Sequence, residues 1–447
     1  MQNSPQPVPA SGSLAYPWFV VAILMVAYVV SFVDRQILNL LVGPIRRDLG
    51  ISDTQMSLLM GFTFAVFYTV MGIPLGKLAD SRSRRGLIAV GVLVWSVMTA
   101  LCGTAKLYWH LLLARIGVGV GEAALSPAAY SMIADYFPPE KRATAISVYS
   151  MGIYVGSGLA FLVGGLVIQF VSAQGAIVLP LVGETRPWQV VFFVLGGAGI
   201  LFSAAFLLVR EPPRQGVKAG ESPATLRELW DYLKTNRRTV LCHNLGFSAI
   251  AFCSYGTGAW IPTFFIRTFG WTPGEIGLVY GLIAMFAGSI GVVCGGRLAD
   301  HWQRQGIADG SLRVGVWAAA LLVPFSVLYL LMPTGTLAAT LMVPLVFLVA
   351  MPFGAAPAAI QDVFPNRLRG QASAIYLFLV NLIGLGLGPT AVALITDFVF
   401  HDDMAVRYSM IIVGCSACAV AALVLAAGLK PYCASVASLR AAQGNVN

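Results

Sequence analysis

Charged side chains are scarce in this sequence. Only 11% of its 447 residues are Asp, Glu, Lys or Arg and 58% are hydrophobic, whereas an average soluble domain is about 25% charged. The mean hydropathy is +0.80. So little charge excludes a soluble domain and predicts a polytopic membrane protein.

Motifs of several functional classes are missing as well. The chain has no His-Glu-x-x-His, no Gly-x-Ser-x-Gly and no Gly-x-x-x-x-Gly-Lys, so we expect neither an enzyme nor a cofactor. Six of the seven cysteines lie in apolar runs, which argues against a disulfide framework and against a metal site. The net charge of +9 is spread over short loops, so no nucleic acid partner is expected.

Apolar runs long enough to cross a bilayer recur twelve times. Their lengths predict an all-α membrane protein with twelve transmembrane helices. The runs cover residues 17–44, 56–78, 87–105, 108–134, 143–171, 188–209, 240–266, 275–298, 314–333, 338–362, 371–398 and 407–430.

Lys and Arg are distributed unevenly over the loops between these runs. With the N-terminus placed inside, the inside loops carry 20 of the 28 basic residues and the outside loops carry 6. Cytoplasmic loops of membrane proteins are enriched in Lys and Arg. We therefore expect a multi-pass protein of the cell (inner) membrane with both termini in the cytoplasm.

The runs divide into two sets of six around a long hydrophilic stretch. The expected organisation is a cytoplasmic tail (1–16), an N-terminal six-helix bundle (17–210), a cytoplasmic linker (211–239), a C-terminal six-helix bundle (240–430) and a second cytoplasmic tail (431–447).

The linker contains a predicted amphipathic helix. Ser222 suits its N-cap and Pro223 its first helical position. An apolar stripe on this helix is expected to lie on the inner membrane face. The stripe consists of Leu226, Leu229, Trp230 and Leu233.

Two short motifs occur once in each half and in the same order. Gly76-Lys-Leu-Ala-Asp80 follows the second run and returns as Gly296-Arg-Leu-Ala-Asp300 after the eighth. Pro127-Ala-Ala in the fourth run returns as Pro357-Ala-Ala in the tenth. The repeat predicts two pseudo-symmetric bundles with a binding site between them at mid-depth.

Four charged residues lie inside the first and fourth apolar runs, namely Asp34, Arg35, Arg115 and Glu122. A charge near the bilayer centre costs roughly 3 kcal/mol, so these side chains should face each other or a wet cavity. Arg115 and Glu122 are seven residues apart and share a helix face, and the three glycines between them leave room for a neighbouring helix. The cluster is either a structural set of ion pairs or a proton and substrate site.

The expected depths favour particular pairings within this cluster. Asp34 should reach Arg115 across the first and fourth helices. Arg35 points about 100° away from Asp34 on the helix and could serve Glu122 or a substrate anion. A nearby Arg favours the charged form of an acid and burial disfavours it, so a moving Arg would couple proton binding to conformation.

The C-terminal runs contain no mid-depth carboxylate or arginine. Their polar candidates for lining a cavity are Tyr255, Tyr280, Tyr376 and Asn381, either as ligands or as packing residues. A charged N-terminal wall opposite an apolar C-terminal wall suits an amphiphile, with its polar head on one side and its tail on the other.

The loop after the second run resembles the signature loop of the major facilitator superfamily, and the resemblance extends over the whole chain. The loop departs from the family pattern at Ser81 and Ser83. Asp80 and Asp300 could each cap a facing helix N-terminus, with Asp80 near Gln371 closing the cytoplasmic side. We expect a conformational latch formed by Gly76, Asp80, Arg84, Arg85, Arg142 and Asp300.

Two longer stretches resemble the Spinster branch of that superfamily. They are Ser31-Phe-Val-Asp34-Arg35-Gln36-Ile-Leu and the stretch from Arg115 through Tyr130. Members of this branch are similar to proton-driven exporters of sphingolipid-type or lysophospholipid-type amphiphiles. The resemblance implies that Asp34 and Glu122 are proton-coupling acids, with Arg35 and Arg115 as their partners or as substrate ligands.

The sequence therefore favours a monomeric, proton-coupled secondary transporter that works by alternating access and exports a lipid-like amphiphile. A transporter of drugs or polar metabolites stays open as an alternative in the same class. A passive lipid scramblase is the alternative from another class, but only two of the twelve runs carry the mid-depth charges that a hydrophilic furrow would need.

Overall fold

Twelve helical spans build the protein. The computed structural model describes residues 14–173, 177–179, 183–214, 225–365 and 367–444. Within these ranges, twelve continuous or broken helices are long and apolar enough to cross a membrane, which confirms the predicted number.

The elements follow the chain in two halves. The N-terminal half contains α1 (Ala15–Gln36), η1 (Ile37–Leu40), α2 (Val42–Leu49), α3 (Asp53–Ser57), η2 (Leu58–Phe62), α4 (Thr63–Ser81), α5 (Arg84–Cys102), α6 (Tyr108–Glu122), α7 (Leu125–Tyr136), α8 (Pro139–Ser150), α9 (Gly152–Ala173), β1 (Ile177–Leu179), β2 (Gly183–Thr185), α10 (Pro187–Ser203) and η3 (Ala204–Leu208). The rest contains α11 (Leu226–Thr235), α12 (Arg237–Phe269), α13 (Pro273–Ile283), η4 (Ala284–Gly288), α14 (Ser289–Arg304), α15 (Gly310–Leu328), η5 (Tyr329–Leu331), α16 (Gly335–Val363), α17 (Arg369–Leu379), η6 (Val380–Leu387), α18 (Gly388–Ile395), η7 (Thr396–Phe400), η8 (Asp403–Ala405) and α19 (Val406–Gly444).

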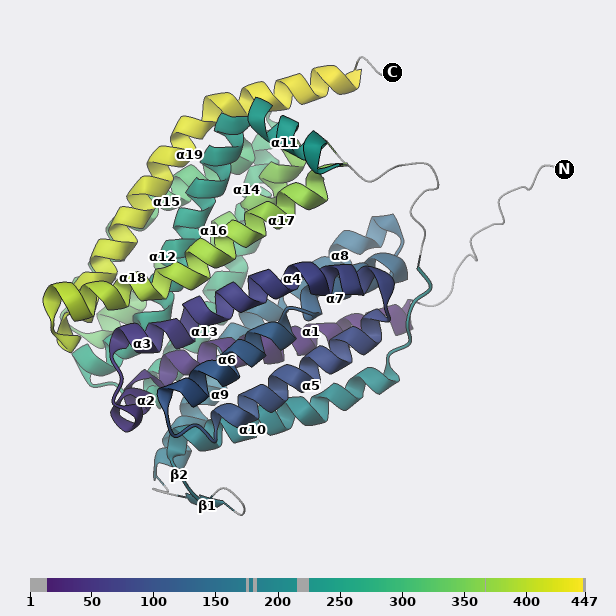
Figure 1. Ribbon diagram of the computed structural model, residues 1–447. Helices are drawn as coiled ribbons and strands as arrows, with labels where there is room; N and C mark the ends of the chain where they lie inside the picture. Colours follow the sequence, from purple (N-terminus) through teal and green to yellow (C-terminus); the bar gives the residue numbers. More distant parts are fainter. Residues whose placement is uncertain (1–13, 174–176, 180–182, 215–224, 366, 445–447) are drawn as a thin grey trace.

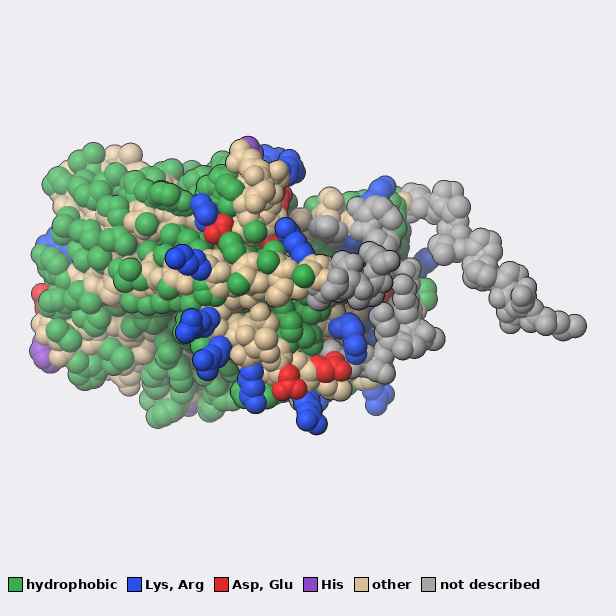
Figure 2. Space-filling view, turned by 90° about the horizontal axis from the view of Figure 1, so that it is seen from above, with side chains coloured by type: hydrophobic (Ala, Val, Ile, Leu, Met, Phe, Trp, Pro, Cys, Tyr) green, Lys and Arg blue, Asp and Glu red, His purple; other side chains and the backbone are tan. Residues whose placement is uncertain are grey.

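The two sets of six spans form two bundles that meet at one end and diverge toward the other (Figure 1). α2, α3 and α18 lie at the end where the bundles meet, which we call the closed end. The start of α1 and the last turns of α19 lie at the diverging end, which we call the open end. Near the open end, Lys and Arg side chains form a band across the face seen in Figure 2, and apolar side chains cover most of the remainder.

Two features were not predicted, namely a short hairpin between two spans and a longer last helix. Between α9 and α10, β1 and β2 form a short antiparallel hairpin in which Val178 pairs with Glu184. α19 continues to Gly444, well past the predicted end at residue 430, because Tyr432 and Val436 are buried against the C-terminal bundle.

The fourth span is broken directly after Glu122. α6 ends at Glu122 and α7 begins at Leu125. Pro127 has no N–H to donate to the preceding turn and crowds the carbonyl of residue 123, which accounts for the break. Before the break, a Cβ at Gly121 would lie 2.7 Å from the main-chain N of Trp95. The predicted close approach of a neighbouring helix to these glycines is therefore confirmed.

Glycines also allow the two bundles to touch along α9 and α13. A Cβ at Gly281 would lie 2.8 Å from the main-chain O of Gly158. Such backbone contact is typical of helices that pack through small residues in membranes. It brings the walls of both bundles close enough to enclose a common space.

The linker helix is shorter than predicted, and it packs on the C-terminal bundle rather than on the membrane surface alone. The predicted cap Ser222 and Pro223 are outside the described residues, and α11 begins at Leu226 with Thr225 as its N-cap, through a capping box with Glu228. Leu229 is buried and Leu233 packs against the core of the C-terminal bundle. The apolar stripe is thus partly covered by protein and does not lie wholly on the membrane.

Adjacent glycines in α10 allow a test of this packing. A Cβ at Gly196 would lie 2.7 Å from the Cα of Ala100, whereas one at Gly197 would meet nothing within 4 Å. We expect Gly196→Ala to destabilise the protein by about 1–3 kcal/mol through overpacking, and Gly197→Ala to be neutral or stabilising because alanine favours helix. Apparent melting temperatures in detergent check this, and an equal effect of both substitutions would contradict it.

Candidate functional site

A cavity of about 440 Å³ lies between the two bundles, within the range of roughly 300–1,000 Å³ that is usual for small-molecule sites. From the N-terminal bundle it is lined by Arg35 and by aromatic and hydroxyl side chains such as Tyr28, Tyr68 and Ser126. The lining from the C-terminal bundle includes no charged residue. The predicted contrast between a charged and an apolar wall is present in part, because the C-terminal wall also carries polar side chains such as Tyr255 and Asn381.

The four polar residues predicted for the C-terminal wall all line this cavity. They are Tyr255, Tyr280, Tyr376 and Asn381. The aromatic lining of the N-terminal wall was not predicted, because the charged residues of the N-terminal runs were the stronger signal and only the tyrosines of the C-terminal runs were cavity candidates. The missed tyrosines are Tyr28, Tyr68, Tyr130 and Tyr154.

Arg35 connects the cavity to a buried acid. Its Nε lies 2.7 Å from Oε2 of Glu122, and its side chain is 12% exposed while that of Glu122 is fully buried. Ser31 donates a hydrogen bond of 2.6 Å to the same carboxylate oxygen. The guanidinium carbon lies 4.5 Å from the centre of the Phe64 ring and 4.7 Å from that of Tyr68, so the arginine is held between an anion and aromatic faces.

Asp34 and Arg115 do not form the predicted ion pair in this structure. Nη1 of Arg115 donates to the main-chain carbonyl of Asp34 at 3.3 Å, and the Asp34 carboxylate accepts from the hydroxyl of Thr99 at 3.1 Å. Arg115 does lie next to Asp34, as expected. The prediction was wrong because the side-chain directions, which sequence spacing does not determine, bring Arg115 to the backbone of α1.

Several buried polar atoms of this cluster have no hydrogen-bond partner among the described residues. They are Oδ1 of Asp34, Oε1 of Glu122, and Nε and Nη2 of Arg115. Asp34, Glu122 and Arg115 are 2%, 1% and 0% exposed. Leaving a buried polar group unpaired costs about 1–3 kcal/mol, and more if it is charged. The cluster therefore has unused capacity to accept and donate hydrogen bonds.

A second group of charges joins the bundles at the closed end. Asp53, fully buried at the start of the second span, accepts from Nη1 of Arg267 at 2.7 Å and lies 2.9 Å from Nη1 of Arg46. Arg46 also pairs with Asp403 at 2.6 Å. Asp397 accepts from both the main-chain N and the hydroxyl of Thr54. We call these residues the closed-end cluster.

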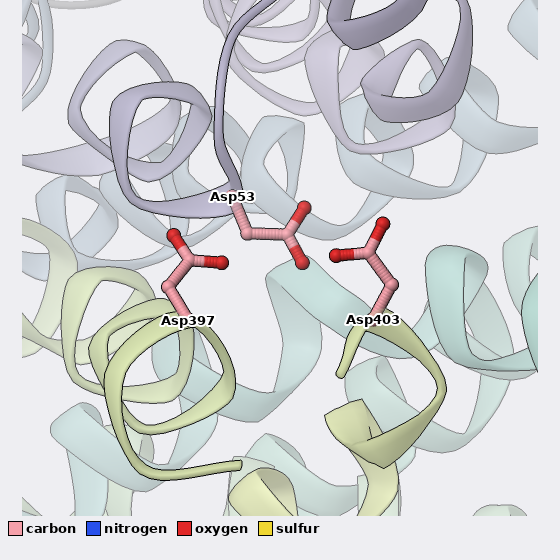
Figure 3. Close-up of side chains that lie close together, drawn as sticks. All are labelled: Asp53, Asp397 and Asp403. Atoms are coloured by element: carbon pink, nitrogen blue, oxygen red, sulfur yellow. The ribbon is translucent and has the colours of Figure 1, made fainter. Parts of the chain in front are cut away.

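Three carboxylates of this cluster face one another in Figure 3, Asp53 from one bundle and Asp397 and Asp403 from the other. One oxygen of each lies within 4.8 Å of the others. Arg46 and Arg267 contact two of these acids, so the negative charge is already largely balanced by protein groups. The sequence does not predict this cluster, because Arg46 and Arg267 stand in outside loops that are more than 200 residues apart along the chain.

Five residues of the predicted latch make no hydrogen bond or ion pair to the opposite bundle among the described residues, namely Gly76, Arg84, Arg85, Arg142 and Asp300. A Cβ at Gly76 would meet nothing within 4 Å, and Asp300 is exposed without a hydrogen bond or ion pair to a described residue. Nη2 of Arg142 donates to Ala134 O. The side chain of Asp80 lies outside the described residues. These positions belong to the open end, where the bundles are apart.

Arg84 and Arg85 instead hold the start of the linker to the N-terminal bundle. Arg84 is buried, pairs with Asp135 and contacts Glu211 at 2.8 Å. Arg85 donates through its main-chain N to Glu211 at 2.9 Å. Partial burial would raise the pKa of the Glu211 carboxyl, but the hydrogen bonds from Arg84, Arg85 and Ser83 outweigh it and lower that pKa.

Comparison with known proteins gives a consistent match. The model of the family described as Major Facilitator Superfamily matches residues 24–389. The chain is 29% identical over 394 residues to an MFS-type efflux pump of Mycolicibacterium smegmatis, with 86% of each chain covered. It is also 29% identical over 411 residues to protein spinster homolog 1 of Rattus norvegicus, covering 86% of this chain and 74% of that protein.

A solved structure shares the arrangement of the spans. It is the crystal structure of a bacterial homolog to the human lysosomal transporter Spinster, in an inward-facing and unoccupied conformation. The TM-score is 0.78 at 28% identity, with 95% of this chain and 98% of that chain covered.

The pairings within the buried cluster can be compared by double-mutant cycles. We expect Arg35→Gln and Glu122→Gln to be non-additive in stability by about 0.5–3 kcal/mol, because each removes the same ion pair. The cycle of Asp34→Asn with Arg115→Gln should show a smaller coupling, since their side chains do not pair. Thermal unfolding in detergent measures both, and the reverse ranking would contradict the observed pairing.

The closed-end cluster predicts a shift in conformation. Removing one partner of a buried pair costs about 3–5 kcal/mol because the other charge is stranded, so Asp53→Asn should favour separation of the bundles at this end. Distances between spin labels at the exposed positions Arg47 and Met404 should lengthen in that variant. Asp48→Asn is the matched control, since the bonds of Asp48 to described residues go to Arg186 and Trp188 of its own bundle. Unchanged Asp53→Asn distances would exclude a closing role.

Proposed function

The chain belongs to the major facilitator superfamily and is a Spinster-like transporter, and from this premise we propose that it exports a lipid-like amphiphile by proton-coupled alternating access. Secondary transport across a membrane follows from the family and the twelve spans. The coupling to protons, the substrate class and the outward direction are supported by the cavity and the charges beside it.

The observation that carries this proposal is the position of Arg35. Its guanidinium lines the cavity and at the same time pairs with Glu122, which is buried behind the cavity wall. An anionic group that entered the cavity would compete with Glu122 for this arginine. One side chain is thus exposed to substrate and bound to an ionisable acid.

Coupling follows from that competition. A proton on Glu122 removes the charge that holds Arg35 and frees the guanidinium for a substrate anion, while loss of the proton restores the ion pair. Asp34 lies next to Arg35 in α1, and one of its carboxylate oxygens has no hydrogen-bond partner among the described residues. It is the second proposed proton acceptor. Binding of proton and substrate would then bias the bundles between two arrangements, as a shift between pre-existing states requires.

The two walls of the cavity support an amphiphile of sphingolipid or lysophospholipid type. Arg35 and the hydroxyl groups of the N-terminal wall suit a polar, anionic head. The C-terminal wall offers apolar contact through side chains such as Leu345, Val349 and Phe353. Both walls come from one chain, which supports a monomer as the transporting unit.

We further propose that the open end faces the cytoplasm of a cell whose inner membrane holds the protein. The distribution of 20 basic residues to inside loops and 6 to outside loops supports this orientation. The band of Lys and Arg near the open end does so as well (Figure 2). The protein would then be inward-facing in this structure, with the closed-end cluster sealing the outer side.

Reconstituted flux tests the function. Proteoliposomes with a pH gradient should accumulate or release a fluorescent lysophospholipid faster than those without one. Glu122→Gln should abolish the effect of the gradient, since glutamine cannot ionise and so cannot form and release an ion pair with Arg35. Glu184→Gln, at an exposed hairpin position, is the matched control and should transport normally.

The same assay separates the alternatives. Flux that is bidirectional and independent of the gradient in the unmodified protein would indicate a scramblase. Similarity to an MFS-type efflux pump favours a drug transporter as the second candidate, and competition by soluble drugs with no lysophospholipid flux would support it. Full gradient-driven flux in Glu122→Gln would remove Glu122 from the mechanism.

A further inference from the structure

α11 uses only one of its faces to bind the C-terminal bundle. Leu229 is buried and Leu233 and Tyr232 pack against the core of that bundle. The hydroxyl of Tyr232 donates to the main-chain O of Val363 at 2.6 Å, and its ring lies 5.2 Å from that of Phe364. These contacts fix the rotation of the helix about its axis.

The two flanks beside this buried face have opposite character. At 100° per residue, Trp230, Lys234 and Arg227 follow one another around the helix from one edge of the buried face. Glu228 lies at the other edge, and Asp231 lies about 40° from Arg227 on the side away from the bundle. Glu228 lies 3.6 Å from Arg367, at the start of the eleventh span. Glu228 therefore faces a base of the bundle, and the flank with Arg227, Trp230 and Lys234 points elsewhere. We call the latter the basic flank.

The basic flank presents a large aromatic ring beside cations. Trp230 is 59% exposed, and Nζ of Lys234 lies 5.3 Å from the centre of its ring. Arg227 is exposed, and so are Arg237 and Arg238 at the start of α12. Trp and Lys or Arg in this combination are typical of segments at the membrane–water interface.

The flank also lies at the edge of the membrane-spanning region. α12 begins three residues after Lys234, and its Leu241 and Leu245 are already exposed as lipid-facing residues are. α11 occupies the open end of the C-terminal bundle, beside the start of α17 and the last turns of α19 (Figure 1). Its exposed cations are therefore at the depth of lipid headgroups.

We propose that the basic flank of α11, extended by Arg237 and Arg238, is a docking surface for anionic lipid headgroups of the leaflet at the open end. Charge complementarity selects this occupant, because juxtamembrane cations attract anionic leaflets. Trp230 enters the interfacial layer, and Arg227 and Lys234 contact the headgroup phosphates. Lipid composition thereby stabilises the linker on the C-terminal bundle, independently of what the central cavity carries.

Hydrogen exchange of the full-length protein in nanodiscs tests this surface. We compare discs of phosphatidylcholine with discs that also contain phosphatidylglycerol. Amides of residues 226–238 should exchange several-fold more slowly with the anionic lipid, and high salt should remove the difference because it screens exposed charges. Neutralising Arg227, Lys234, Arg237 and Arg238 with glutamine should also abolish it. Asp231→Asn, which removes an acid about 40° from Arg227 on the helix, should preserve or increase it.

The unmodified protein alone decides the question, so a folding defect of the neutralised variant does not matter. Equal exchange in both kinds of disc would overturn the proposal. A probe attached at position 230 gives a second readout. It should be shielded from a water-soluble quencher in anionic discs, and full access of the quencher would show that the flank faces water or a soluble partner instead.

Discussion

A charge in the hydrocarbon layer needs a partner, and this requirement organises the N-terminal bundle. Arg35 and Glu122 come from the first and fourth spans and meet at 2.7 Å. The glycines of α6 bring that helix against α4 and α5, and Glu122 ends α6 because Pro127 breaks the span. Stranding either charge would cost about 3–5 kcal/mol. The two residues therefore stabilise each other as one ion pair. Arg35 of this pair also lines the cavity.

Buried ion pairs also join the two bundles at the closed end, and their modest net stability is compatible with separation of the bundles there. A buried ion pair has a modest net stability, because desolvation offsets much of the attraction between its charges. Asp53 with Arg267, and Arg46 with Asp403, can therefore join the bundles without locking them permanently. The seam of α9 and α13 adds backbone contact through Gly158 and Gly281 but no charge. Specific attraction at one end and smooth packing along the seam are compatible with the alternating access that we propose.

Much of this organisation could be predicted from the sequence. Hydropathy determines the number of spans, the repeated motifs indicate two bundles, and the charges inside apolar runs mark Asp34, Arg35, Arg115 and Glu122. Pairing was harder, because rotamers and inter-bundle distances decide it. Arg115 turned to the backbone of Asp34 rather than to its carboxylate. Asp53 and Arg267, 214 residues apart, meet only in the folded chain. The docking of α11 on protein likewise depends on a surface that the rest of the chain creates.

The two halves share an architecture and differ in chemistry, and their difference has a physical reason. A second set of mid-membrane charges would add another desolvation cost and another group that needs a partner. In the proposed mechanism, one set of charges is sufficient to couple proton and substrate, because Arg35 already borders the shared cavity and contacts the buried acid. The C-terminal wall can then remain uncharged and provide apolar contact over a broad area. Asymmetry between the halves places Arg35 and the buried acids on one side of the cavity. In the proposed mechanism, a proton on Glu122 would alter the hold on a polar head without disturbing the apolar side chains of the other wall.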